Sequence, residues 1–420
     1  DPLVELPSEY KELESLLNDM PITKANGEPG LLHDEAFGKA IDSGRLPEYD
    51  LSKVEDVQLL HALFRDYTFL TSAYLLEPCH KRFLATGDYG LGRSVLPKCI
   101  AKPLCTVAAK LNVRPFMEYA LSYALYNWRL LDRDLGFKVD NMRIIRSFEG
   151  SSDESGFILV HVAMVSHTGR LVEAANKMVE SLKLKSRPDF NSAIKQYYET
   201  LSLINTEMET MWKHSLTSGY NRFRTFIMGI KNQPMFPDGV VYEGVIDPET
   251  REESPRYAFR GESGANDSII PLSDNLFQLI DAMPENPLTK ILIDFRTYRP
   301  PEHNAYLKDM EEKARQLNLV DYAVSDAESA KYYLLNLDKI REFRTRHWNF
   351  TKEYILKHSK HPRATGGSPI VTWLPNQLKT VLVKIIEAPC GDESGIKARA
   401  NEQLLTLEEE VDKLRARYNQ

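Results

Sequence analysis

Long stretches of the chain carry apolar residues at the spacing of an α-helix. In each stretch the apolar residues return every three or four positions, so that they share one face of a helix. The stretches cover residues 57–76, 197–216, 332–355 and 374–386. The alternation that is typical of strands is confined to residues 239–242 and 289–295. The pattern therefore predicts a mainly α protein with minor β structure.

Clusters of Gly, Pro and small polar residues mark where these elements are expected to end. They lie at residues 21–29, 98–103, 150–156, 233–260, 299–301 and 361–369. The cluster at 150–156 is the strongest candidate for a domain boundary. We therefore expect a small N-terminal domain, mainly α with minor β, over residues 1–150, and a larger all-helical domain over residues 151–390.

Residues 391–420 are predicted to form a separate amphipathic helix. Leu404, Leu407, Val411, Leu414 and Tyr418 repeat at steps of three and four among charged residues, which makes a seam of about two heptads. A seam of this length does not establish a coiled coil. Two interpretations stay open: a helix laid on the body of a monomer, or the contact of a dimer.

The composition excludes several classes of function. The chain has 420 residues, of which 42% are apolar and 27% charged, and a net charge of -7, as in ordinary soluble proteins. No basic run offers a surface for nucleic acid. The longest apolar run, residues 157–165, is shorter than the roughly 18 residues of a membrane span. Four scattered cysteines suit a reducing compartment, so we expect a cytoplasmic protein, and whether a segment was removed before Asp1 stays open.

The ten histidines form no metal-binding cluster, but one of them lies on an apolar helical face. His347 shares this face with Tyr333, Leu337, Ile340, Phe343, Phe350 and Tyr354. Arg344, three residues before His347, emerges close to the same face. A haem would offer an iron to His347 and propionates to Arg344. A core histidine that donates to a carbonyl is the alternative.

A second histidine, His161, lies within an apolar run at residues 157–162. Neither His161 nor His347 has the companion four residues away that a zinc pair on a helix would have. Two isolated buried histidines suit the two sides of a haem better than they suit zinc. For His161 as well, ordinary core packing stays open.

Short motifs spread over residues 110–385 together point to a known family. They are Tyr126-Asn127-Trp128, residues 152–162, residues 220–224 with Gly229, residues 238–244, residues 259–263, Asp267-Ser268, residues 298–303, His347 and residues 364–367. In this order they resemble the indoleamine 2,3-dioxygenase family, the haem enzymes that open the indole ring of tryptophan with dioxygen. Within that family the chain resembles a non-mammalian, fungal-type member.

The resemblance implies a haem-dependent dioxygenase. Its substrates would be dioxygen and L-tryptophan or a related indole, which is cleaved between indole C2 and C3 to N-formylkynurenine, the first step of the kynurenine pathway toward NAD. The cofactor would be haem b, active as Fe²⁺, with His347 as the proximal iron ligand. The small N-terminal domain would cap the larger haem-binding domain and form one side of the distal pocket.

The resemblance also implies which side chains surround the haem. Asp274 stands where the family has a carboxylate bonded to the far nitrogen of the proximal imidazole, a contact that raises the donor strength of the ligand. Arg344 would pair with a propionate. Gly261 and Ser263 would lie beside the haem, with Ser263 near both a propionate and the substrate amine.

Further positions are implied for the substrate. Arg224 matches the family's arginine for the tryptophan carboxylate, whose planar, bidentate geometry suits a guanidinium. Phe157 would lie against the indole ring. The segment Thr365, Gly366 and Gly367 resembles a mobile loop that closes over the substrate through hinge-like changes at its glycines. The other expected pocket residues are Ile227, Gly264 and Tyr123, with Ser122 as the alternative to Tyr123.

Three positions depart from the mammalian pattern. His161 replaces a serine, whereas the related tryptophan 2,3-dioxygenases have a distal histidine that hydrogen-bonds the indole NH. We therefore expect His161, together with Ser263, to act in catalysis. Glu262 replaces a glycine, and Gly219 replaces a bulky aromatic residue near the substrate. These departures leave open another indole or aromatic substrate, or a haem-binding sensor or interaction protein without turnover.

Overall fold

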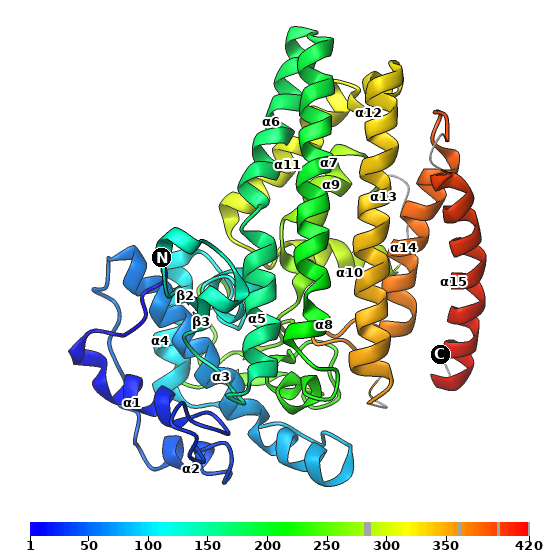
Figure 1. Cartoon of the computed structure of the whole chain (residues 1–420). Helices are drawn as coiled ribbons and strands as arrows, with labels where there is room; N and C mark the ends of the chain where they lie inside the picture. Colours follow the sequence, from blue (N-terminus) through cyan, green and yellow to red (C-terminus); the bar gives the residue numbers. More distant parts are fainter. Residues whose placement is uncertain (281–286, 359–360, 362, 393–394, 419–420) are drawn as a thin grey trace.

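The computed structural model describes residues 1–280, 287–358, 361, 363–392 and 395–418. The described chain is mainly α-helical, as predicted (Figure 1). Its helices are α1 (Lys11–Asp19), α2 (Phe37–Asp42), α3 (Val57–Thr86), α4 (Lys98–Leu111), α5 (Ser152–Val165), α6 (Thr168–Leu184), α7 (Arg187–Glu209), α8 (Met211–His214), α9 (Ile269–Leu276), α10 (Pro287–Arg296), α11 (Pro301–Gln316), α12 (Leu319–Val324), α13 (Ala327–Phe350), α14 (Ile370–Glu387) and α15 (Ile396–Tyr418). None of these helices is both long and apolar enough to cross a membrane.

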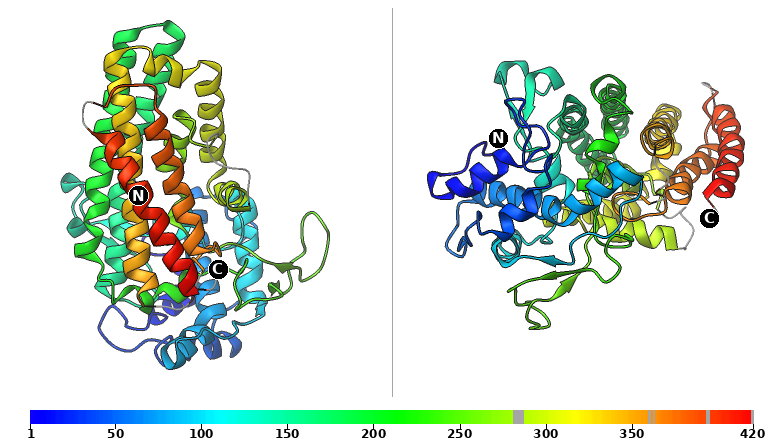
Figure 2. Two further views of the ribbon diagram at one scale, coloured as in Figure 1. Left: turned by 90° about the vertical axis from the view of Figure 1, so that its right-hand side faces the viewer. Right: turned by 90° about the horizontal axis from the view of Figure 1, so that it is seen from below.

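Long helices stand side by side in the larger part of the molecule (Figures 1 and 2). α6 packs on α7, α7 on α13, α13 on α14 and α14 on α15, while α2 and α4 pack on α3 at the N-terminal end. Most buried apolar residues fall into two cores. The first joins residues 6–163 with residues 211–245 and Tyr354, and the second joins residues 164–208 with residues 269–411. Because α5 contributes to both, it lies where the two cores meet.

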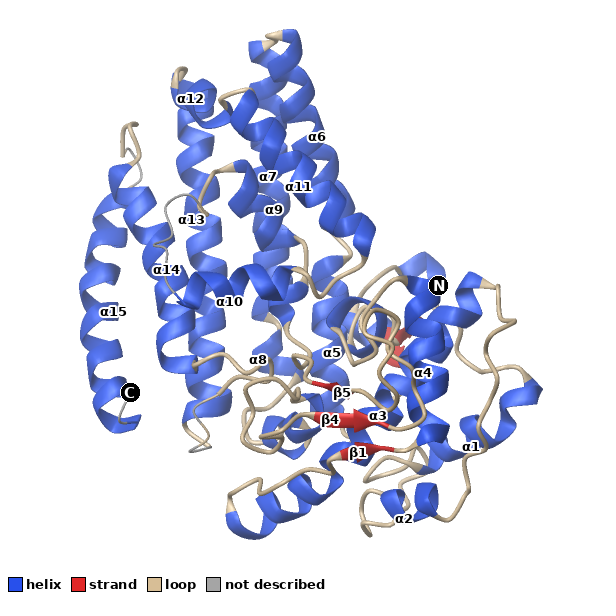
Figure 3. Ribbon diagram, turned by 180° about the vertical axis from the view of Figure 1, so that it is seen from behind, coloured by secondary structure: helices blue, strands red, loops and turns tan. Residues whose placement is uncertain are grey.

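Two small sheets complete the fold (Figure 3). β1 (Val95–Leu96) pairs in parallel with β4 (Val240–Tyr242), which pairs antiparallel with β5 (Arg256–Tyr257). β2 (Trp128–Leu130) and β3 (Met142–Ile144) form an antiparallel pair. The strand expected at 239–242 is therefore confirmed, but the segment 151–390 is not all-helical. Its strands β4 and β5 extend a sheet that begins in the first 150 residues, while the domain boundaries themselves stay predictions.

The strand expected at residues 289–295 is wrong, because this segment belongs to helix α10. Ile291, Leu292 and Phe295 fall at helical spacing and pack together with Trp373 of α14. The helix begins at Pro287, a first position that proline favours, since its missing N–H has no partner there in any helix. Contact with a segment far along the chain therefore decided the structure of this short apolar run.

Two of the expected breaks are in fact helix starts. Residues 98–103 form the beginning of α4, in which Ile100, Leu104 and Val107 are buried at helical spacing despite Pro103. In the cluster 150–156, the Ser151 hydroxyl accepts a hydrogen bond from the Glu154 N–H and caps α5. A Cβ on Gly156 would lie 1.8 Å from the His214 carbonyl oxygen, so this glycine permits α5 to pack closely on the α7–α8 region.

The C-terminal helix α15 lies on the body of its own chain. Ile396, Ala400, Leu407 and Val411 are buried in the second core. Glu410 accepts hydrogen bonds from the Trp348 indole at 2.8 Å and from the Lys352 ammonium at 2.7 Å, both on the segment that carries His347. The structure thus shows the first of the two interpretations of this helix, and a dimer stays untested.

A buried ion cluster ties the N-terminal helices to the segment after β3. Arg146 pairs with Asp66 of α3 and Glu14 of α1, and Arg65 also pairs with Asp66. Burial alone would raise the pKa of Asp66, but the charges of Arg146 and Arg65 outweigh it and hold the pKa below its usual range. Asp66 is therefore the shared anion of two buried guanidinium groups.

We predict that Asp66→Asn lowers the free energy of unfolding by about 3–5 kcal/mol at neutral pH, because it removes the buried carboxylate that Arg65 and Arg146 share and leaves Arg146 with Glu14 alone. A carboxyl whose pKa is depressed by folding stabilises the native state at neutral pH, and this contribution is lost as the pH falls through the folded-state pKa. The difference between wild type and variant in urea unfolding should therefore shrink in acid. Equal unfolding midpoints at pH 7 would contradict the role of Asp66.

Candidate active site

A cavity lies between α5, α13, α14 and the loop segments before α9 and α14. Its interior holds about 170 Å³. His161 and Phe157 of α5 line it together with Arg344 and His347 of α13. Other parts of its wall are apolar, with Met164, Met208, Ile270, Leu292, Phe343, Phe350, Ile355 and Leu374. The cavity thus combines two imidazoles and a guanidinium group with largely apolar walls.

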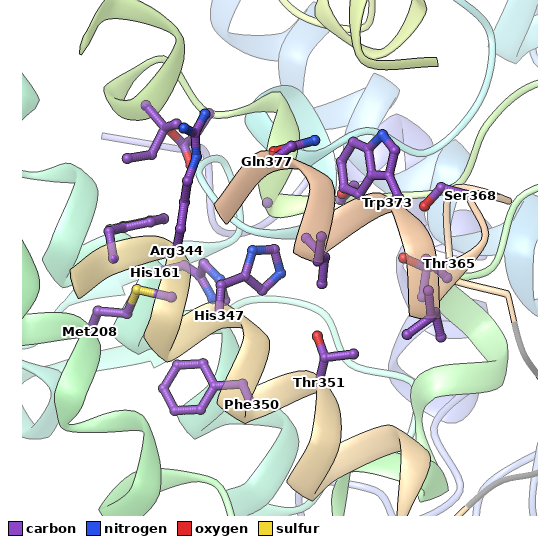
Figure 4. Close-up of a pocket in the computed structure, with 18 of the residues that line it drawn as sticks. His161, Met208, Arg344, His347, Phe350, Thr351, Thr365, Ser368, Trp373 and Gln377 are labelled. Carbon is purple, nitrogen blue, oxygen red and sulfur yellow. The ribbon is translucent and has the colours of Figure 1, made fainter. Parts of the chain in front are cut away.

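His347 projects into this cavity from the last turns of α13 (Figure 4). The helix begins at a capping Asp326, whose carboxylate accepts from the Glu328 and Ser329 N–H groups, and continues beyond His347 as a π-helix, Thr351–Leu356. Burial lowers the pKa of His347 to about 4, and nearby His161 adds to the effect. The imidazole is therefore neutral at physiological pH, the form in which histidine binds a metal.

A cluster of two arginines and one carboxylate lies at the edge of the cavity. Arg344 Nη2 lies 2.9 Å from both oxygens of Asp274, and Arg296 Nη2 lies 2.8 Å from one of them. Arg344 Nε, Arg344 Nη1 and Arg296 Nε are buried without a partner among the described residues. Buried donors on charged groups require acceptors, so the cluster presents an incomplete site for an anion.

The position of Asp274 differs from the one that the resemblance implied. Its carboxylate is bonded to the two guanidinium groups, and no hydrogen bond to His347 is among the contacts of the described chain. Charge-assisted pairs with two arginines are stronger than a hydrogen bond to a neutral imidazole. This difference explains why Asp274 binds the guanidinium groups and not His347. Arg296 was not among the predicted site residues, because residues 289–295 directly before it resembled a strand.

His161 faces the cavity with a defined tautomer. Its Nδ1 lies 2.7 Å from the Phe157 carbonyl oxygen, which only accepts, so Nδ1 must carry the proton. Burial lowers the pKa of His161, and Nε2 is therefore an unprotonated acceptor. This atom lies 3.7 Å from the place where a Cβ on Gly264 would be, and Gly264 also lines the cavity.

Aromatic rings surround His161. The Phe157 ring lies 4.8 Å from the imidazole, centroid to centroid, and the Tyr119 ring meets it edge-on at 5.7 Å. Tyr119 was not among the predicted site residues, because the sequence pattern near it could be aligned only with a one-residue slip. Of the two alternatives there, the Ser122 hydroxyl is bonded to the Glu118 backbone. The Tyr123 hydroxyl is buried without a described partner, although Tyr123 does not line the cavity.

The loop expected to move is tied to its neighbours by hydrogen bonds. Thr365 Oγ1 donates to the Glu262 carbonyl at 2.7 Å, and the Gly229 N–H donates to the Thr365 carbonyl at 2.9 Å. The Gly366 carbonyl accepts from Arg260 at 2.9 Å. Of these loop residues, Thr365 lines the cavity and Gly366 does not. The structure thus presents the loop in a packed arrangement against the wall of the site.

Close backbone approach explains the glycines behind this wall. A Cβ on Gly261 would lie 2.3 Å from the Gly229 nitrogen, and 2.7 Å from the Ile227 carbonyl oxygen. Gly367 has a φ of 83°, which disfavours other residues. Gly261 and Ile227 therefore shape the wall from behind, whereas Ser263 and Gly264 line the cavity itself.

Arg224 is buried but does not line the cavity. Its Nη2 donates to the Arg363 carbonyl at 2.8 Å, its Nη1 lies 3.4 Å from the Tyr89 hydroxyl, and its Nε has no described partner. Gly219 does not line the cavity either. A Cβ at this position would lie 1.9 Å from an Asp153 carboxylate oxygen, so Asp153 occupies the space that a side chain at position 219 would need.

Comparison with known proteins identifies the family. The family model described as indoleamine 2,3-dioxygenase matches residues 1–389. The chain belongs to the indoleamine 2,3-dioxygenase family. The predicted resemblance is confirmed, and the match ends before helix α15, which begins at Ile396.

The relatives of this indoleamine 2,3-dioxygenase family member do not all carry the name of an enzyme. Indoleamine 2,3-dioxygenase 1 of Rattus norvegicus is 23% identical, with 92% of each chain covered. Indoleamine 2,3-dioxygenase of Saccharomyces cerevisiae is 24% identical, over 88% of this chain and 80% of its own length. The myoglobin of Haliotis diversicolor is 24% identical, over 82% of this chain and 86% of its own length.

Enzymes of the indoleamine 2,3-dioxygenase family depend on haem, and the residues of the cavity fit this group. A haem needs an axial ligand, apolar walls and partners for two propionates. The cavity offers the neutral His347 imidazole, its apolar lining, and the unpartnered donors of Arg344 and Arg296. A bare metal ion is a poorer match, since the described residues contain no group of three or more His, Cys, Asp or Glu that could hold one.

We predict that His347→Ala weakens haem binding by at least about tenfold, since loss of even an outer partner of a ligand has an effect of that size. Titration of haem into the purified protein, followed by the Soret band, measures the affinity. His80→Ala is the matched control, because His80 is also buried with its pKa lowered to about 4 but lies outside the cavity. Equal haem affinity of His347→Ala and wild type would refute the assignment.

Proposed function

We propose that this protein is a haem-dependent dioxygenase that inserts both atoms of dioxygen across C2–C3 of L-tryptophan and forms N-formylkynurenine, the first step of the kynurenine pathway. One observation carries the proposal most strongly. A neutral imidazole able to ligate iron, His347, and an imidazole with a free acceptor nitrogen, His161, face the same cavity. The first suits a cofactor and the second suits an indole N–H.

In this proposal, haem b as Fe²⁺ supplies the activation of dioxygen, and the protein supplies binding and orientation. His347 holds the iron, and Arg344 and Arg296 hold the propionates. The apolar lining excludes water, and the Phe157 ring packs against the indole. Ser263 and Gly264, which line the cavity near His161, border the space left for the substrate.

The role of His161 follows from its tautomer. Because Nδ1 donates to the Phe157 carbonyl, Nε2 is available to accept the indole N–H. This bond fixes the rotation of the indole in the cavity without removing a proton from it. His161 therefore orients the substrate and does not act as an obligatory base.

The substrate carboxylate is assigned to Arg224. The Nε of Arg224 is a buried donor without a described partner, and a carboxylate would satisfy it. Arg363 and Tyr89 now take the other contacts of the guanidinium, so a carboxylate reaches Arg224 when residues 363–367 shift. This requirement agrees with the mobile loop implied by the family.

The direct test is turnover. The holoprotein, reduced with ascorbate, is incubated with L-tryptophan in air, and the products are separated by chromatography. We expect N-formylkynurenine to accumulate. Its absence from a reaction with fully haem-loaded protein would refute the proposed function.

A second candidate function is reversible dioxygen binding without turnover. The similarity to the myoglobin of Haliotis diversicolor favours it, because that chain matches over most of its length and is named for a different role. The same incubation separates the two candidates: a dioxygen carrier forms a stable oxygenated spectrum in the presence of L-tryptophan and yields no N-formylkynurenine.

We predict that His161→Ala lowers kcat/KM for L-tryptophan roughly fivefold, as expected for the loss of a hydrogen bond of about 1 kcal/mol. Turnover of 1-methyltryptophan, which has no indole N–H to donate, should stay nearly unchanged. Steady-state kinetics with both substrates measure the difference. Equal losses on the two substrates would rule out this role of His161.

We predict that Arg224→Ala lowers kcat/KM for L-tryptophan by the equivalent of about 2–5 kcal/mol, because it breaks a buried charge pair with the substrate. Tryptamine, which lacks the carboxylate, should be affected far less. Arg222→Ala is the neighbouring control, since Arg222 is half-exposed and pairs with Glu149 and Asp153. Unchanged kcat and KM for L-tryptophan in Arg224→Ala would exclude the assignment.

A further inference from the structure

The Glu262 carboxyl is a buried acid for which the structure provides no counter-charge. Glu262 is among the residues that line the cavity, and it is only 3% exposed. Among the described contacts, Glu262 is bonded through its backbone carbonyl, which accepts from Thr365, and its carboxyl oxygens have none. Buried carboxyls are normally hydrogen-bonded or paired, so this one requires an explanation.

Three other buried acids have the usual partners, whereas Glu118 has one buried carboxylate oxygen without a described partner but lies outside the cavity. Asp66 and Asp274 each pair with two arginines. Glu154 accepts the backbone N–H groups of Phe148 and Glu149 at 2.8 and 2.7 Å. Among the described residues Glu262 has neither kind of partner, and it belongs to the lining of a cavity. The contrast indicates that its partner is a ligand.

The ionisable groups around Glu262 supply no cation to it. The charge of Glu262 acts on three tyrosines, Tyr119, Tyr123 and Tyr220. His161, Asp267 and the ion cluster of Arg296, Arg344 and Asp274 line the same cavity, and both arginines of that cluster pair with Asp274. The tyrosines are neutral because burial raises their pKa values, and His161 is neutral because burial lowers its own. Burial raises the pKa of Glu262 to about 8, so this carboxyl is protonated at neutral pH when no cation lies beside it.

Glu262 and Arg224 both lie within electrostatic range of Tyr220. The Tyr220 phenol is influenced by the positive charge of Arg224 and by the negative charge of Glu262. An amino acid is a zwitterion and needs an anion for its ammonium group as well as a cation for its carboxylate. Glu262 and Arg224 offer this pair beside a cavity whose other polar groups include the acceptor nitrogen of His161.

We propose that the Glu262 carboxylate binds the ammonium group of the substrate, and that it selects amine-bearing indoles over indole acids that lack an amine. The proposal rests on the proposed function in taking an indole as the occupant of the cavity. It adds one further subsite, the one that binds the ammonium group. Glu262 is thereby a specificity-determining residue, at a position where the mammalian enzymes have a glycine.

The protonation of Glu262 gives this subsite a distinct signature. A cation bound at the carboxyl favours its ionised form, so the proton leaves Glu262 for the solvent when the ammonium binds. The binding of an amine-bearing indole near pH 7 should therefore release about one proton. An indole acid without an amine should release none at this group.

The test compares three ligands on the holoprotein: L-tryptophan, tryptamine and indole-3-propionate. Dissociation constants are measured from the shift of the Soret band, for wild type and Glu262→Gln. We expect the variant to bind L-tryptophan and tryptamine at least tenfold more weakly and to bind indole-3-propionate within twofold of wild type. Because the subsite acts in binding, KM for L-tryptophan should rise while kcat changes little.

The matched control is Glu118→Gln. Glu118 is also buried, with its pKa raised to about 7, but it lies outside the cavity. This variant should bind all three ligands as wild type does. Equal weakening of all three ligands in Glu262→Gln, or unchanged affinity for both amines, would overturn the subsite.

A measurement on wild type keeps the proposal testable if Glu262→Gln does not fold. Titration calorimetry in buffers of different ionisation enthalpy counts the protons released on binding. Release with tryptamine and none with indole-3-propionate supports the subsite, and equal release with both overturns it. A holoprotein that binds the amines in this way but forms no N-formylkynurenine refutes the proposed function alone. Turnover with an unchanged KM in Glu262→Gln refutes the subsite alone.

Discussion

The withdrawal of the His347 imidazole from water is the constraint on which the site depends. It keeps the ring neutral, with its pKa lowered to about 4, and so leaves a lone pair for a metal. The same apolar surroundings that achieve this exclude unpaired charge from the cavity. Arg344 and Arg296 are therefore neutralised in part by Asp274 at its edge, and Glu262 is held in its protonated form. The electrostatics of the whole site follow from this burial.

The sequence predicted the elements whose apolar pattern is long and regular. The stretch at 332–355 became α13 and its π-helical continuation, and the stretch at 374–386 became α14. The periodicity placed His347 and Arg344 near one face, and the structure brings both to the cavity. The structure of two short segments was predicted wrongly. Helix α10 packs against Trp373, and the first turns of α5 pack closely against His214 through a glycine. Such contacts join residues far apart in the chain and leave no local pattern.

Side-chain partners were harder to predict than positions. The structure brings Phe157, His161, Ser263, Gly264, Asp274, Arg344, His347 and Thr365 to one cavity, but it leaves Tyr123, Arg224, Ile227, Gly261 and Gly366 outside its lining. Asp274 joins two arginines because Arg296, on a misjudged helix, competes for it. The glycines at 229 and 261 serve backbone contact between segments that only the fold brings together. The roles of all these residues stay predictions that the proposed variants test.

The central claim is that this cavity holds haem and tryptophan together so that dioxygen is inserted into the indole. The most direct measurement is turnover of L-tryptophan by the ascorbate-reduced holoprotein under ¹⁸O₂, with mass spectrometry of the product. We expect N-formylkynurenine that carries two labelled oxygen atoms from one dioxygen molecule. A product with one labelled oxygen, or a stable oxygenated protein that leaves tryptophan unchanged, would contradict it.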